Sequence, residues 1–118
     1  MNPTQVKKTL QSLRQPFFFH REDGRNLSMI KVGIYRIQFL GPWLDPGVPP
    51  RVAYFHTHWV AVRGPWVLDT VVDPSSWIRL TEWIVRIHAY SNEAPSTGWK
   101  WTHFYELPQP GLKEAYLK

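Results

Sequence analysis

The sequence predicts a single α+β domain, residues 1–118, with a mostly antiparallel sheet of about four strands. Its length of 118 residues suits one domain, and 43% of the residues are hydrophobic, so the chain can bury a core. Some segments repeat apolar residues at helical spacing, whereas others alternate apolar and polar residues as strands do. Their order along the chain is helix, three strands, helix, strand, which is typical of the α+β class.

The N-terminal helix is expected over residues 2–14. Asn2 suits an N-cap, Pro3 suits the first turn, and Val6 and Leu10 fall on one face at helical spacing.

Three strands are expected next, over residues 29–40, 51–62 and 66–72, because these segments alternate and are rich in β-branched and aromatic residues. Residues 41–50 hold four prolines and two glycines, so they are expected to form a structured loop. The turn at 63–65 makes the second and third strands a hairpin.

The longer helix is expected over residues 73–90, between the third and fourth strands. Asp73 is its predicted cap, and Pro74 its first turn. A fourth strand is expected over 99–107, and residues 107–118 form a tail. The apolar stripe of the helix consists of Trp77, Leu80, Trp83, Ile84 and Ile87.

Composition excludes several classes of protein. The chain has no cysteine, which rules out disulfides, thiolate zinc sites and a cysteine nucleophile. It has no apolar run of membrane-spanning length and no signal-type apolar core, so we expect a cytoplasmic protein. The net charge of +5 favours an acidic partner, although the basic residues are scattered.

The predicted hairpin carries the residues that come closest to a catalytic or metal site. On a strand, His56 and His58 share a face, because side chains alternate. A turn centred between residues 63 and 64 puts Asp69 opposite His58. A centre between residues 64 and 65 instead puts Asp73 opposite His56. Both registers set a carboxylate beside an imidazole. A three-residue turn would instead put Thr70 opposite His58, and the sequence leaves these alternatives open.

His56, His58 and Asp69 match the spacing of the metal motif of JAB/MPN-type metalloproteases, which the segment resembles over about 14 residues. This resemblance implies a zinc-dependent hydrolase with these three residues as metal ligands. The sequence departs from the motif at two positions. Trp59 stands where the family has proline, and Trp66 where it has the serine that helps hold the tetrahedral oxygen.

The segment "THWVAVRGPWVLDTVVDP" resembles the histidine hairpin of papain-like cysteine peptidases, including the NlpC/P60 and C39-like groups. The resemblance implies that His58 corresponds to the general base, and that Asp69 or Asp73 orients its ring. The nucleophile of that family is missing because the chain has no cysteine. The resemblance therefore favours a non-catalytic relative that kept the hairpin.

A looser resemblance covers residues 37–106 and links the chain to small uncharacterised proteins of phage and mobile elements. It implies no activity. The matching residues are Gly41, Pro42, Trp43, Thr57, His58, Trp59, Gly98, Trp99, Thr102 and His103.

Taken together, these patterns favour a non-catalytic binding or accessory protein with a protein partner. Trp43 lies in the proline-rich loop, where a large aromatic side chain is either a lid on the core or a contact anchor. Trp43, Trp59 and His103 are the predicted binding residues, and His103 is expected to share a face with Trp99, Trp101 and Tyr105. Zinc hydrolysis is one alternative. Nucleic-acid binding is the other, because basic and aromatic residues alternate in two strands.

Overall fold

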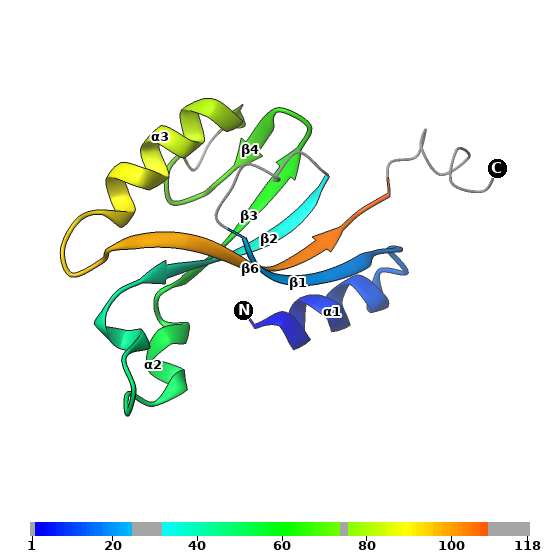
Figure 1. Ribbon diagram of the computed structural model, residues 1–118. Helices are drawn as coiled ribbons and strands as arrows, with labels where there is room; N and C mark the ends of the chain where they lie inside the picture. The colour runs from blue at the N-terminus through cyan, green and yellow to red at the C-terminus, as the bar shows by residue number, and fades with distance from the viewer. Residues whose placement is uncertain (1, 25–31, 74–75, 109–118) are drawn as a thin grey trace.

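The computed structural model describes residues 2–24, 32–73 and 76–108, and it confirms the α+β class. A six-stranded antiparallel sheet has α3 over one face and α1 over the other (Figure 1). None of the described helices is long and apolar enough to cross a membrane. The elements in chain order are α1 (Pro3–Ser12), β1 (Phe18–Gly24), β2 (Gly33–Leu40), the 3-10 helix η1 (Pro42–Leu44), α2 (Pro50–Tyr54), β3 (Thr57–Arg63), β4 (Trp66–Leu68), β5 (Ile78–Arg79), α3 (Leu80–Ser91) and β6 (Gly98–Glu106).

The strands lie in the order β1-β6-β2-β3-β4-β5. The last strand, β6, therefore lies between β1 and β2 and pairs antiparallel with both. Because both neighbours supply hydrogen bonds, β6 is an interior strand of the sheet, and it connects β1 to β2 (Figure 1).

The structure has six strands where the sequence predicts about four. No strand was predicted before residue 29, but Phe18–Gly24 form β1 at one edge of the sheet. Edge strands pair on one side only, so they tolerate polar sequences that resemble loops. The other additional strand, β5, is a two-residue edge strand paired with β4, and β4 itself ends at Leu68 rather than at residue 72.

Two boundaries differ from the prediction because of local backbone constraints. Residues 51–54 belong to the short helix α2, since Pro50 at the first helical position fixes a helical φ. Helix α3 begins at Leu80 and not at Asp73, because Ile78 and Arg79 are extended and pair with β4. Asp73 is therefore not the cap of α3, and the predicted Pro74 lies outside the described residues.

The main core lies between α3 and the sheet. Trp83 and Ile87 of α3 pack against the central strands, and the exposed fraction of each is 1% or less. Trp77, predicted on the same stripe, lies before the helix and is 43% exposed. The buried residues of this cluster are Tyr35, Ile37, Val60, Val62, Val67, Ile78, Leu80, Trp83, Ile87, Trp99, Trp101 and Phe104.

A smaller core lies on the other face, under α1. Val6 and Leu10 pack against Tyr105 of β6, whose hydroxyl donates to the Pro3 carbonyl at 2.8 Å. Asn2 caps the helix as predicted, because its side chain accepts from the Gln5 backbone N–H at 2.8 Å. This packing fixes the N-terminus of α1 against the sheet.

Candidate functional site

The structure brings His58 and Asp69 together. Arg63 lies opposite Trp66, so the two-residue turn is 64–65, the second of the two predicted registers. Counting back along the hairpin puts His58 and Asp69 on one face as diagonal neighbours, which lie within reach of each other. His58 Nε2 and Asp69 Oδ1 are 2.5 Å apart.

The Asp69 carboxylate has hydrogen-bond partners at both of its oxygens. It is 1% exposed, its Oδ1 also accepts from the backbone N–H groups of Val71 and Val72, and its Oδ2 accepts from Trp83 Nε1 at 2.8 Å. Burial alone raises the pKa of Asp69, but the hydrogen bonds from His58 and Trp83 outweigh it and lower the pKa. The ionised carboxylate thus links the hairpin to α3.

Asp73 is placed differently from Asp69. Its carboxylate accepts from the Ser76 hydroxyl at 2.9 Å, and its backbone N–H donates to the Asp69 carbonyl. The small hollow beside His58 has Asp69 but not Asp73 among its described lining residues. Of the two predicted orienting carboxylates, the one that contacts His58 is therefore Asp69.

His56 does not share a strand face with His58, because it lies before the start of β3. Its ring stacks on Trp43, with ring centroids 3.6 Å apart and planes within 6°. Trp43 is 8% exposed and its indole N–H donates to the Phe39 carbonyl at 2.7 Å. Of the two predicted roles for Trp43, this burial favours the lid on the core.

The predicted zinc ligands do not fit a zinc ion in this arrangement. Among residues 2–24, 32–73 and 76–108, no group of three or more His, Asp or Glu side chains could hold a metal. Asp69 already has a donor at each oxygen, and His58 Nε2 faces Asp69 rather than an open coordination position.

The hollow beside His58 has a volume of about 140 Å³ and offers little for nucleophilic chemistry. Its hydroxyl groups are those of Thr57 and Tyr90, and the Thr57 hydroxyl donates to the Tyr54 carbonyl at 2.7 Å. The described lining residues are Phe39, Phe55, His56, Thr57, His58, Asp69, Val71, Val72, Ile87 and Tyr90.

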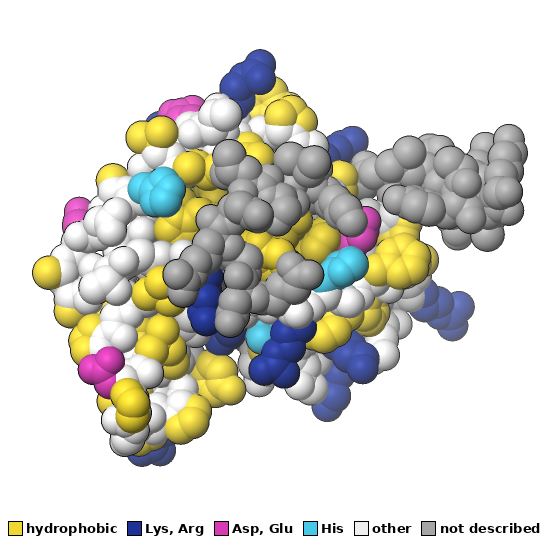
Figure 2. All heavy atoms as spheres, viewed as in Figure 1, with side chains coloured by type: hydrophobic (Ala, Val, Ile, Leu, Met, Phe, Trp, Pro, Cys, Tyr) yellow, Lys and Arg dark blue, Asp and Glu magenta, His cyan; other side chains and the backbone are white. Residues whose placement is uncertain are grey.

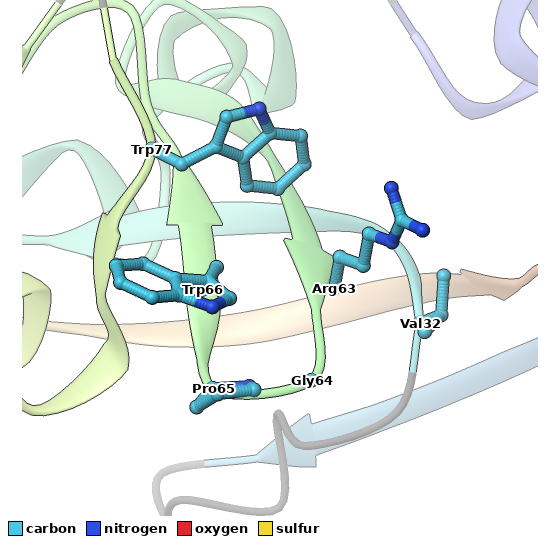
Figure 3. Close-up of a pocket in the computed structure, with 6 residues that line it drawn as sticks. All are labelled: Val32, Arg63, Gly64, Pro65, Trp66 and Trp77. Atoms are coloured by element: carbon cyan, nitrogen blue, oxygen red, sulfur yellow. The ribbon is translucent and has the colours of Figure 1, made fainter.

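A second hollow, of about 690 Å³, lies at the β3–β4 turn. Trp66, Trp77 and Arg63 are among the residues that line it (Figure 3). The two tryptophans are 40% and 43% exposed, and the Arg79 guanidinium lies 5.0 Å from the centre of the Trp66 ring. This apolar surface was not predicted as a site.

A basic surface that was not predicted as a site lies on the α1 face. Two adjoining hollows, of about 630 and 500 Å³, share the wall residues Arg21, Arg36, Tyr54 and His103, and we call them together the basic hollow. None of its described lining residues is acidic. The remaining lining residues are Asn2, Pro3, Thr4, Gln5, Gln38, Leu44, Thr57, Lys100 and Thr102.

The basic residues of this hollow come from neighbouring strands. On β6, His103 lies opposite Arg21 of β1 on one side and opposite Arg36 of β2 on the other. In Figure 2, several Lys and Arg side chains gather over the region of β1 and α1. The row thus sets two arginines on the strands to either side of His103.

Arg36 is the buried member of the row. It is 4% exposed, and among the described residues its guanidinium has no carboxylate partner. One nitrogen donates to the Thr102 hydroxyl at 3.0 Å, and the guanidinium lies 5.3 Å from the centre of the Tyr54 ring. Burial lowers the pKa of Arg36 below its ordinary value, but an arginine stays charged in proteins.

Thr102 connects Arg36 to His103. Its hydroxyl oxygen accepts from Arg36, and the same hydroxyl is hydrogen-bonded to His103 Nδ1, 2.8 Å away. Burial, followed by the charges of Arg36 and Arg21, lowers the pKa of His103 to about 4. His103 is therefore neutral at pH 7.

The predicted facing of His103 is wrong in part. A bulge at Thr102 interrupts the pairing of β6 with β2, since Arg36 lies opposite His103 whereas Ile37 lies opposite Trp101. The extra residue turns His103 away from the tryptophan face and toward α1. Trp59 also faces α1, where it packs against Tyr105 with ring centroids 6.3 Å apart.

Comparison with protein-family models, with curated proteins and with solved structures finds no match to this chain. The resemblances of the hairpin and of residues 37–106 therefore stay predictions, and the proposals below are based on the geometry of the described residues.

Proposed function

We propose that this chain is a non-catalytic binding protein whose basic hollow receives an anionic group of its partner. The observation that supports this most strongly is the buried Arg36 guanidinium without a carboxylate partner among the described residues. Removing an ion from water costs several kcal/mol, unless a counter-charge and hydrogen bonds compensate it. A bound anion would supply that counter-charge.

The surroundings of Arg36 favour an anion over a neutral ligand. Arg21 adds a second positive charge, and the neutral His103 lies between the two arginines. Residues 2–5 contribute the N-terminus of α1, where the helix dipole is positive. The positive charge along this wall thus favours a group that accepts hydrogen bonds and carries negative charge.

Catalysis is not part of the proposal. His58 and Asp69 have the pairing of a general base and its orienting residue, as the papain-like resemblance implies. However, the chain has no cysteine, and the Thr57 hydroxyl beside His58 is engaged with a backbone carbonyl. The pair is better explained as the link that fixes the hairpin to α3.

Thermal unfolding in increasing inorganic phosphate tests the proposal, with sodium chloride at matched ionic strength as the control. A ligand that binds only the folded state stabilises it, by about 2.7 kcal/mol at a hundred times the Kd. We expect phosphate to raise the Tm of the natural chain and not that of Arg36→Met. An equal rise in both proteins, or none in either, would contradict the proposal.

A further inference from the structure

Exposed aromatic rings border the basic hollow. Tyr54, in its wall, is 59% exposed. On the β1 side, Phe19 is 49% exposed and lies against His103, with ring centroids 5.9 Å apart. About half or more of the surface of each ring stays in water, so these rings add less to folding than buried rings do.

The combination of buried charge and exposed rings narrows the class of anion. Phosphate groups accept hydrogen bonds from arginine and from helix N-termini. Bases of a single strand present flat faces that stack on aromatic side chains, whereas the bases of a duplex already stack on one another. An acidic peptide would satisfy Arg36 but would leave the rings of Tyr54 and Phe19 without a matching partner.

We propose that the partner of the basic hollow is single-stranded nucleic acid, with a backbone phosphate at Arg36 and Arg21 and bases on Tyr54 and Phe19. This inference rests on the proposed function, since it names the anionic partner. The net charge of +5 agrees with it, because a polyanion gains from every additional basic side chain near its path.

Fluorescence anisotropy with a labelled single-stranded oligonucleotide of about 12 nucleotides tests the inference, since one small domain covers a site of this order. Both DNA and RNA strands are used, beside the matched duplex and a glutamate-rich peptide. We expect the single strand to bind more tightly than the duplex or the peptide. Affinity should fall as salt rises, with a slope of about −0.7 in log K per phosphate contacted.

Two pairs of variants separate the charge from the rings. Arg21→Ala and Arg86→Ala remove the same charge, but Arg86 lies on α3, away from the hollow. Only Arg21→Ala should lower the salt slope. Tyr54→Ser should weaken binding about tenfold, the loss expected for one stacked base, whereas Val85→Ser on exposed α3 should not.

The outcomes distinguish this inference from the proposed function. Phosphate stabilisation through Arg36 without oligonucleotide binding would overturn the inference and leave the anion site intact. Tighter binding of the duplex or of the peptide would also overturn it. If neither phosphate nor the oligonucleotide bound to the natural chain, both the inference and the proposed function would be overturned.

Discussion

The two faces of the sheet differ in the hydrogen-bond partners that they provide for a buried charge. On the α3 face, Asp69 receives donors from His58, from Trp83 and from two backbone N–H groups. On the α1 face, Arg36 is equally hidden, yet a single hydroxyl and one aromatic ring are its partners among the described residues. A buried charge that receives its hydrogen bonds from the fold itself indicates a structural role. A buried charge that lacks them indicates a ligand-binding site.

Some buried polar groups on the α3 face also lack hydrogen-bond partners in the described part of the chain. The indole N–H groups of Trp99 and Trp101 are buried and have no hydrogen-bond acceptor in the described part of the chain. An unpaired neutral donor costs less than an unpaired charge, so these groups do not weaken the contrast between Asp69 and Arg36.

The largest expected effect is on the α3 face. Asp69→Ala removes the acceptor of four hydrogen bonds and leaves several buried donors unpaired, so we expect a loss of about 3–5 kcal/mol in the free energy of unfolding. Urea denaturation measures it. A loss below about 1 kcal/mol would show that Asp69 does not link the hairpin to α3.

On the α1 face, the corresponding substitution should have a much smaller effect. Arg36→Met keeps much of the side-chain volume and removes the cost of a buried, uncompensated cation, so we expect a change within about 1 kcal/mol, of either sign, without ligand. The same urea series measures it. A loss as large as that of Asp69→Ala would erase the difference between the two faces.

The pH dependence of stability sharpens the same comparison. Because the pKa of His103 is about 4 in the folded chain and its ordinary value is 6.5, the unfolded chain binds a proton before the folded chain does. Stability should therefore fall as the pH drops from 6.5 toward 4. Urea midpoints across this range measure the fall, and His103→Asn should lack this component. An identical slope in both proteins would refute the prediction.

The smallest effect is expected for an exposed pair on α3. Glu82 accepts from Arg86 one helical turn away, with the two atoms 2.6 Å apart. Both side chains are largely solvated, so Glu82→Ala should cost about 0.3–0.5 kcal/mol. Urea denaturation of this variant gives the change in the free energy of unfolding that is typical of a solvated charge. A loss of stability above about 1 kcal/mol would mean that the pair is not solvated.

The local sequence pattern was enough to predict the α+β class and the N-terminal helix. It left the register of the hairpin open. The register that occurs is not the one that places Asp69 directly opposite His58, and the two residues meet as diagonal neighbours. Edge strand β1 was missed because a strand with one partner needs little apolar sequence.

The basic hollow could not be predicted in the same way. It depends on β6 lying between β1 and β2, which brings Arg21, His103 and Arg36 together from distant parts of the chain. It also depends on the bulge at Thr102, a single extra residue that reverses the facing of His103. No short sequence pattern records either property, although the interleaved basic and aromatic residues were a weak signal of the surface.

The most direct test of the central claim is the pKa of His103, measured by NMR titration of its imidazole in phosphate and in chloride of equal ionic strength. The positive charges of Arg36 and Arg21 help to lower this pKa to about 4, and a bound anion would offset them. We predict that phosphate raises the pKa of His103 above its value in chloride. An unchanged pKa at phosphate concentrations that stabilise the fold would contradict the placement of the anion in the basic hollow.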